Sequence, residues 1–255
     1  MAETSSAAAQ RRTLSRIKAI RDRWHTKRHP FFTEFGKGRL PLRAMGLYMA
    51  QHYQFVQHAL PSFGLLLAKA PADVRRAVIE NLAEEAGVTA GHGEGHAPHD
   101  HVEDIFAFTR AAGLKDKEVR NLPMTPAWWA RSLHYVATMR NEPVGVILAM
   151  QATQEGQQVA LNVEVTLPAF ARHYGYPRGS SAIAFFEEHA EADEEHSSRQ
   201  LDLCVRYIDT PALQARALVV AEEACMLRWA SITDLYRSEV LKERPVLPPS
   251  PRGKR

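Results

Sequence analysis

The sequence has little cysteine, no long apolar run and only an average share of glycine and proline. Cys204 and Cys225 are the only cysteines among 255 residues, which excludes a disulfide framework and indicates a reducing compartment. No apolar stretch approaches the ~20 residues of a membrane span, and the first residues lack the basic and then apolar layout of a secretory signal. We therefore expect a soluble, cytoplasmic globular protein that does not contact a membrane.

Neither basic nor acidic residues are in large excess, but the net charge is unevenly distributed along the chain. The net charge is +3, with +6 in residues 1–28 and +4 in residues 242–255, so residues 29–241 carry −7. Basic segments are one signature of nucleic-acid binding, but no aromatic residue beyond Trp24 alternates with the basic ones. We expect a solvated first helix, a basic proline-rich tail over 242–255 and no nucleic-acid partner.

The alternating pattern of strands is also absent, whereas helical periodicity recurs along the chain. The spacing predicts helices over residues 14–29, 40–70, 71–86, 101–113, 126–140, 143–172, 181–207 and 211–239. Residues 1–12 are rich in alanine, serine and glutamine, and we expect them to be disordered. The sequence therefore predicts an all-α fold, in which residues 13–241 form a single helical bundle of about seven or eight helices.

Metal-binding side chains are concentrated in the helix predicted over 181–207. His189, Asp193 and His196 stand at positions i, i+4 and i+7, which a period of 3.6 residues places on one face. Two imidazoles and a carboxylate suit a first-row metal such as iron or manganese. The alternative is an acidic surface helix with incidental histidines, but Phe185 and Phe186 favour contact between this helix and the core.

Other predicted helices supply further carboxylates and imidazoles. Glu155 follows an apolar run and is placed to point inward, the alternative being an exposed helix acid, and Glu85 lies at a helix end. The neighbouring acids of the 181–207 helix are interpreted as a solvated face: Glu187, Glu188, Glu191, Glu194 and Glu195. Four histidines fall within ten residues: His92, His96, His99 and His101. Carboxylates and imidazoles from several helices of a bundle are how di-iron carboxylate sites are built.

The pattern Phe-Phe-x-x-His-x-x-x-Asp-x-x-His over residues 185–196 resembles the last ligand helix of the heme-oxygenase-like di-iron oxidases. These share their fold with the pyrroloquinoline-quinone biosynthesis protein C and with TenA proteins. The resemblance covers about residues 20–240 and includes the segments 29–31, 51–53 and 222–236. It implies a heme-oxygenase-like bundle with the metal ligands Glu85, His101, Glu155, His189, Asp193 and His196.

Two positions of the implied ligand set have rivals. The family places a carboxylate at the end of the third core helix, where both Glu84 and Glu85 stand, and we prefer Glu85 because Ala-Gly follows it. A histidine that opens the next helix is the family's next ligand, which favours His101, but His92 lies only seven residues after Glu85 and remains a rival.

The implied function is that of an O2-dependent oxidoreductase. Two iron ions per chain, or an iron–manganese pair, would use O2 as co-substrate on a small amino-acid, amine or fatty-acid-like molecule, by N-oxygenation, decarboxylation or C–C cleavage. An external electron donor and a homodimer complete the expectation. For a substrate carboxylate, Arg43, Lys69 and Arg199 are candidate counter-ions.

Two other function classes remain open. A metal-free oxidase resembling protein C would need a pocket lined with basic side chains and tyrosine, and a binding protein without enzymatic activity would need only the fold. The chain also departs from the family at Gln154, where some members that make 4-aminobenzoate carry a tyrosine that is consumed in the reaction.

Overall fold

The computed structural model describes residues 2–88 and 100–244, and for residues 2–6 and 191–198 it describes the backbone alone. Within these ranges helices account for nearly all regular structure, and the β pairing is limited to an isolated bridge between Ala86 and Asp100. The predicted all-α class is therefore confirmed. No described helix is both long enough and apolar enough to cross a membrane.

In the described ranges, eight helices of at least eleven residues build the bundle, in agreement with the predicted number. They are α1 Ala2–Arg23, α3 Leu42–Leu67, α4 Ala72–Glu85, α5 His101–Ala111, α7 Pro126–Asn141, α8 Val144–Glu155, α11 Ala184–Tyr207 and α12 Pro211–Leu235. Shorter helices and turns connect them: η1 Thr26–Arg28, α2 Pro30–Gly36, α6 Asp116–Asn121, α9 Gln158–Leu161, η2 Asn162–Thr166, α10 Leu167–Ala169, η3 Phe170–Tyr174, η4 Ser181–Ile183 and η5 Tyr236–Val240.

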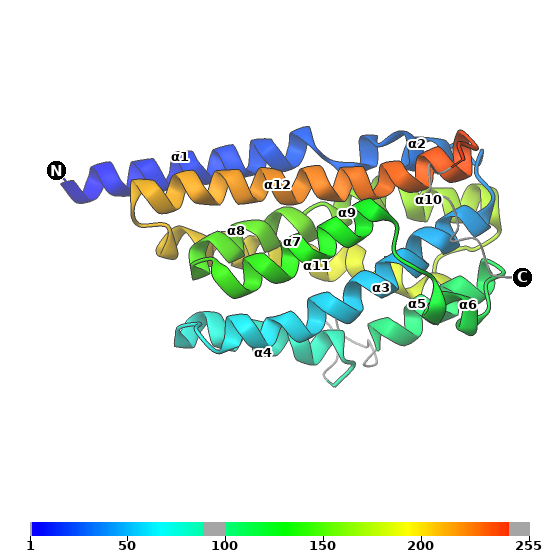
Figure 1. Cartoon of the computed structure of the whole chain (residues 1–255), viewed down its shortest axis with the longest axis horizontal. Helices are drawn as coiled ribbons and strands as arrows, with labels where there is room; N and C mark the ends of the chain where they lie inside the picture. Colours follow the sequence, from blue (N-terminus) through cyan, green and yellow to red (C-terminus); the bar gives the residue numbers. More distant parts are fainter. Residues whose placement is uncertain (1, 89–99, 245–255) are drawn as a thin grey trace, which may run out of the picture.

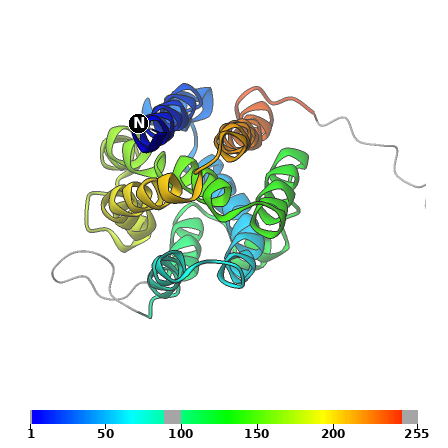
Figure 2. The ribbon, with the colours of Figure 1, turned by 90° about the vertical axis from the view of Figure 1, so that its left-hand side faces the viewer.

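Helix α8 forms the centre of the bundle. Both α11 and α12 pack on it, α12 also packs along α1 and α7, and α3 packs against α7 and α5. Figure 1 shows α1 and α12 side by side along one edge and α4 at the opposite edge, and Figure 2 shows most helices nearly end-on. Every residue of α8 from Gly145 to Gln154 is buried. The next residue, Glu155, therefore ends a helix that is surrounded by others.

The end of α4 and the start of α5 are fixed close together. Gly87 follows α4 with φ +64°, a conformation that strains other residues. Asp100 caps α5 by accepting hydrogen bonds from two backbone N–H groups of its first turn. The bridge between Ala86 and Asp100 joins the two ends. As a result Glu85 and His101, the last residue of α4 and the first of α5, are neighbours in space.

Helices α8 and α11 approach to backbone contact at Gly145. A Cβ atom at this position would overlap the carbonyl oxygen of Tyr207, so only glycine permits the approach. Cys204 on α11 donates from its Sγ to the Gly145 carbonyl oxygen at 3.3 Å. Both Cys204 and Cys225 are buried and carry no disulfide, as expected for structural thiols.

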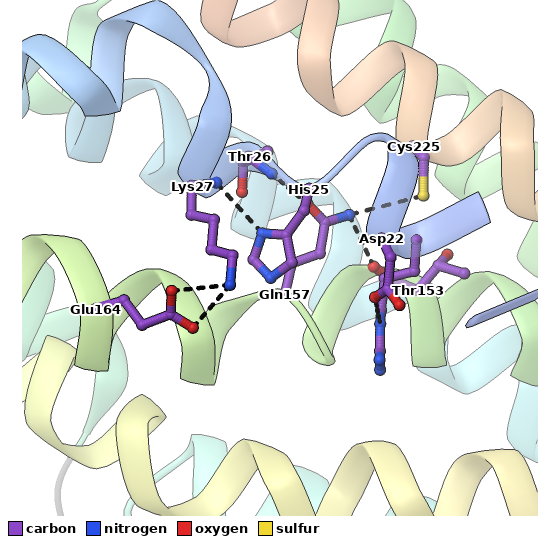
Figure 3. Close-up of polar contacts among 9 residues, drawn as sticks. Asp22, His25, Thr26, Lys27, Thr153, Gln157, Glu164 and Cys225 are labelled. Atoms are coloured by element: carbon purple, nitrogen blue, oxygen red, sulfur yellow. Dashed lines mark hydrogen bonds and ion pairs between the residues drawn. The ribbon is translucent and has the colours of Figure 1, made fainter. Parts of the chain in front are cut away.

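A buried glutamine fixes the turn that follows α8 (Figure 3). The side chain of Gln157 accepts a hydrogen bond from the Thr26 backbone N–H at 2.9 Å. Its Nε2 atom donates to the Thr153 carbonyl oxygen at 3.0 Å and contacts Cys225 Sγ at 3.7 Å. These contacts join η1, α8 and α12 immediately beyond Glu155, so they hold the end of α8 in place.

The structure differs from the predicted elements in two segments. Instead of a disordered segment over residues 1–12, α1 begins at Ala2, because alanine strongly favours helix. Gln10 Nε2 also donates to the Val205 carbonyl oxygen at 2.8 Å, which ties α1 to α11. The single helix predicted over 143–172 is interrupted at Gly156 and continues as α9, η2, α10 and η3. Of the predicted tail over 242–255, residues 245–255 lie outside the described residues.

Candidate metal centre

A cavity of about 110 Å³ lies between the helices. Its walls combine aromatic and aliphatic side chains with polar side chains from seven helices, α3, α4, α5, α7, α8, α11 and α12, and from α9. The charged and other strongly polar lining residues are His52, Glu85, His101, Arg131, Gln154, Glu155, Gln158, His189 and Arg228. Four of the six sequence-predicted ligands therefore meet in one cavity.

Three of these ligands form a compact cluster. Glu85, His101 and His189 come from α4, α5 and α11, and one ligand atom of each lies within 4.8 Å of the other two. Glu85 Oε2 is 2.6 Å from His101 Nδ1, and the two imidazole rings have centroids 4.7 Å apart. Ligand atoms around one first-row metal ion, each bonded at about 2.0–2.2 Å, are separated by at most about 4.4 Å. Small side-chain movements would suffice to bind an ion here.

The ring of His189 is oriented for metal binding. Its Nδ1 atom lies 2.7 Å from the Phe185 carbonyl oxygen, which can only accept, so Nδ1 carries the proton and Nε2 has a free lone pair. Burial and the nearby His101 lower the pKa of His189 to about 4, so the ring is neutral at pH 7. The Phe185 ring stacks on it with centroids 4.1 Å apart. This is the arrangement of a metal-ligating histidine whose second nitrogen is held by a carbonyl group.

His101 lies between two carboxylates. Its Nδ1 contacts Glu85, and its Nε2 lies 3.1 Å from Glu188 Oε2. Burial alone would lower the pKa of His101, but Glu85 and Glu188 outweigh it and raise this pKa well above its ordinary value. Burial likewise opposes ionisation of Glu85, and His101 outweighs it and lowers the pKa of Glu85 to about 2. A protonated imidazole thus supplies the positive charge that these buried carboxylates require, a charge that a metal ion also provides.

The environment of Glu155 also favours a cation. Its Oε2 accepts a hydrogen bond from Gln200 Nε2 at 2.5 Å. Burial, with a contribution from Glu85, raises the pKa of Glu155 to about 8. A carboxyl group with this pKa is largely protonated at pH 7 in the absence of a counter-charge, so binding of a cation would favour its ionised form.

Comparison with known proteins identifies the family of this chain. A family model described as "Iron-containing redox enzyme" matches residues 47–229. The chain belongs to this family. The match includes Glu85, His101, Glu155 and the whole of α11, so the cluster lies within the matched residues.

Individual relatives of this chain are distant. It is 25% identical over 228 residues to a Nitrosomonas europaea protein named 4-aminobenzoate synthase, with 84% of this chain and 87% of the relative covered. A TenA homolog from Pseudomonas syringae has 14% identity and a TM-score of 0.70, with 89% of this chain and 92% of that one covered. A Shewanella denitrificans domain with a heme oxygenase-like fold has 15% identity, a TM-score of 0.71 and the same coverage. The solved structures show that the fold is heme-oxygenase-like, as the sequence resemblance implied.

The donor set fits the metal that the family description names. Imidazole nitrogen and carboxylate oxygen are common ligands of non-heme iron. In this chain Glu85, His101 and His189 provide both types within 4.8 Å of one another. Glu85, which was preferred over Glu84, and His101 both lie in the cluster.

The remaining predicted ligands lie on α11. The helix is continuous from Ala184 to Tyr207, so Asp193 and His196 occupy the positions i+4 and i+7 after His189, but their side chains lie outside the described residues. The rival ligand His92 lies outside the described residues as well, together with His96 and His99.

The sequence did not reveal one carboxylate that contacts the cluster. Glu188 was interpreted as part of a solvated face, yet its side chain is only 17% exposed and contacts His101. A usable signal was its position three residues after Phe185, which places Glu188 near the face that Phe185 turns toward the core.

The candidate counter-ions for a substrate carboxylate lie away from the cavity. Arg43 donates to the Gly113 carbonyl oxygen, and Arg199 pairs with Glu80. Lys69 donates to two backbone carbonyl oxygens at the end of α7, those of Arg140 and Glu142. None of the three lines the cavity. Two arginines that were not singled out, Arg131 on α7 and Arg228 on α12, do line it.

Proposed function

We propose that this protein is a non-heme di-iron oxidase or oxygenase that uses O2 on a small amino-acid, amine or fatty-acid-like substrate. The observation that carries the proposal is the convergence of Glu85, His101 and His189, from three helices, in a cavity that Glu155 also lines. Family membership supports iron as the metal. Asp193 and His196, one and two turns beyond His189 on α11, complete the proposed set of six ligands.

The residues of this chain would position and protect the metal. The Phe185 carbonyl oxygen holds the His189 ring with Nε2 available, and Gln200 orients the Glu155 carboxylate. The apolar walls, which include Phe55, Phe63 and Phe185, limit the access of water to the cavity. Bound iron would supply the electrons that reduce O2.

The proposal includes expectations about partners and location. We propose an external electron donor, because oxidised iron must be reduced before another turnover, and we propose a cytoplasmic homodimer. Synthesis of 4-aminobenzoate, the activity in the name of the Nitrosomonas europaea relative, is one candidate reaction. This chain would have to perform it without a tyrosine at position 154, where it has Gln154.

Metal analysis and oxygen consumption test the proposal together. The wild-type chain, purified from iron-supplemented cells, should carry about two iron ions, as a two-metal site requires. The reduced protein should consume O2. His189→Ala and Glu85→Ala should each lose iron and O2 consumption while the helical circular dichroism is kept.

His134→Ala is the matched control for that experiment. His134 is a partly buried histidine that also contacts a glutamate, Glu223 at 3.2 Å, but it does not line the cavity. The control should keep the iron content and O2 consumption of the wild type. Full iron occupancy in His189→Ala would contradict the proposed ligand set.

A metal-free oxidase is the second candidate, and one observation favours it. Arg131, Arg228, His52, Tyr48 and Tyr135 give the cavity the basic and phenolic groups that such an enzyme would use. Turnover of a substrate with O2 by a preparation that contains no iron would favour this candidate. A chain with neither iron nor turnover would favour a binding protein without enzymatic activity.

A further inference from the structure

Two arginine side chains are buried in the wall of the cavity. Arg131 is 6% exposed and Arg228 is 3% exposed, and both line the cavity that holds the candidate metal ligands. Among the residues that the structure describes, neither guanidinium has a carboxylate within 4 Å. Uncompensated buried charge is costly, because a protein interior solvates ions poorly. A pair of such charges beside a cavity therefore requires an explanation.

The Arg131 guanidinium is held in place with part of its hydrogen-bonding capacity free. It lies over the Phe55 ring at 4.3 Å and near the Trp128 ring at 5.0 Å. Its Nη2 donates to Gln154 Oε1 at 3.2 Å. Its Nε and Nη1 atoms are buried without a hydrogen-bond partner.

Arg228 has a similar arrangement on the neighbouring helix. Its Nη1 donates to the Gln154 carbonyl oxygen, and its Nη2 donates to Gln158 Oε1 at 2.5 Å. Its Nε atom is buried without a partner. Gln154 thus accepts hydrogen bonds from both guanidinium groups, one at its side chain and one at its backbone, and it links the two groups.

The two positive charges disfavour each other. Burial, followed by the proximity of Arg228, lowers the pKa of Arg131 to about 9, which still leaves Arg131 protonated at pH 7. An anion between them would relieve the repulsion and accept hydrogen bonds from the free N–H groups. Arginine forks match the two oxygens of a carboxylate in geometry as well as in charge.

We propose that Arg131 and Arg228 form the subsite that binds the carboxylate group of the substrate. This inference rests on the proposed function, because it assigns the substrate of the same cavity. The small volume and the aromatic and aliphatic walls favour a carboxylate on a compact apolar body over a larger or more highly charged anion such as a phosphate ester. The substrate is therefore a small carboxylic acid, with its carboxylate held by α7 and α12 and its body extending into the cavity that Glu85, His101 and His189 line.

Calorimetric titration of the metal-free protein tests the subsite without iron. Acetate, hexanoate and benzoate serve as carboxylate probes, and benzamide serves as a neutral analogue of benzoate. At least one carboxylate should bind, benzamide should not, and Arg131→Met should weaken carboxylate binding at least about tenfold, as the loss of charge-assisted hydrogen bonds predicts.

Arg120→Met is the matched control. Arg120 also lies over a phenylalanine ring at 4.3 Å, that of Phe106, but it does not line the cavity. This variant should bind carboxylates as the wild type does. If circular dichroism shows that Arg131→Met is unfolded, Arg131→Lys replaces it, because lysine keeps the charge but lacks the fork, and it should weaken binding severalfold.

The outcomes separate this inference from the proposed function. Iron uptake by Arg131→Met equal to that of the wild type, together with weakened carboxylate binding, supports the subsite. Carboxylate binding that depends on Arg131 in a protein that takes up no iron also supports it, although the di-iron proposal would then fail. The inference is overturned if no carboxylate binds, if binding requires iron and Glu85 but not Arg131, or if benzamide or inorganic phosphate binds as tightly.

Discussion

At the scale of single residues, buried histidines differ in pKa and in hydrogen bonding according to what their rings contact. His189 donates from Nδ1 to a carbonyl oxygen and has a pKa lowered to about 4, whereas His101 lies between two carboxylates that raise its pKa. His29 represents a third case, because its Nδ1 accepts a hydrogen bond from the Phe31 backbone N–H at 3.1 Å. In the metal-free chain, the contacts of the two ring nitrogens therefore determine whether a buried histidine is neutral, protonated or a helix cap.

The cap role of His29 predicts a loss of stability in acid. Burial lowers its pKa to about 4, below the ordinary 6.5, so the unfolded chain takes up the proton first as the pH falls. The contribution to stability is complete above about pH 6.5 and decreases toward pH 4. Between pH 7 and pH 5 the loss of this contribution should lower the free energy of unfolding by about 1–2 kcal/mol.

Denaturant unfolding at several pH values checks this prediction. His29→Asn keeps an acceptor at the cap position but removes the titrating group. The variant should lose less stability than the wild type between pH 7 and pH 5. Parallel pH profiles for the two proteins would contradict the assigned pKa of His29.

Glu188 gives a second prediction at this scale. Its carboxylate contacts His101 Nε2, so it would fix the orientation of the ring when metal is bound. Glu188→Ala should weaken iron binding about 10- to 100-fold, as for other residues that orient metal ligands. Glu187→Ala is the control, because Glu187 accepts hydrogen bonds from the Gly179 backbone N–H instead. Equal iron affinities of the two variants would show that Glu188 has no such role.

At the scale of helices, α8 and α11, which carry the proposed ligands Glu155 and His189, approach to backbone contact at Gly145. Gly145→Ala introduces a Cβ atom against the Tyr207 carbonyl oxygen, and separating the helices to make room should cost about 1–3 kcal/mol. Gly64→Ala is the control within α3, where no atom lies within 4 Å of the new Cβ, and it should be neutral or slightly stabilising. Thermal unfolding of both variants tests the difference, and equal stabilities would contradict a backbone contact at Gly145.

The helices were largely predictable from the sequence because their ends carry local signals. Pro126, Pro211 and Gly87 mark a start or an end, and a period of 3.6 residues needs no tertiary information. The break at Gly156 was missed because no proline marks it and helix resumes two residues later, at Gln158. The arginines that line the cavity were missed because Arg131 and Arg228 lie 97 positions apart in the sequence, and only packing of α7 against α12 brings them together.

The ligand cluster was predictable in part for the same reason. His189 belongs to a stripe within one helix, which spacing alone defines. Glu85, His101 and Glu155 were candidates in the sequence, and the resemblance to a family implied their role as ligands. The role of Glu188 depends on the position of His101, which belongs to another helix. Contacts between helices therefore account for what sequence reasoning did not find.

At the scale of the whole molecule, the stability of the helices is uneven. Every residue of α8 from Gly145 to Gln154 is buried, whereas α4 buries only Val74 and Val78 and lies at the edge of the bundle in Figure 1. Segments with few buried contacts open at low free-energy cost. Glu85 is the last residue of α4, so a metal bound by Glu85, His101 and His189 would tie this helix to α5 and α11.

Metal binding should therefore slow amide hydrogen exchange along the whole of α4, and not only at its last residue, Glu85. In the metal-free protein, amides of residues 72–85 should exchange faster than those of 144–155, and anaerobic addition of Fe(II) should slow the exchange in 72–85 because binding stabilises only the closed state. At 100 times the dissociation constant the added protection corresponds to about 2.7 kcal/mol, or roughly 100-fold in exchange rate. Glu85→Ala should abolish the effect and His134→Ala should preserve it. Unchanged exchange in α4 on iron binding would mean that Glu85 does not bind the metal, since a bond to the end of this helix cannot leave its opening unaffected.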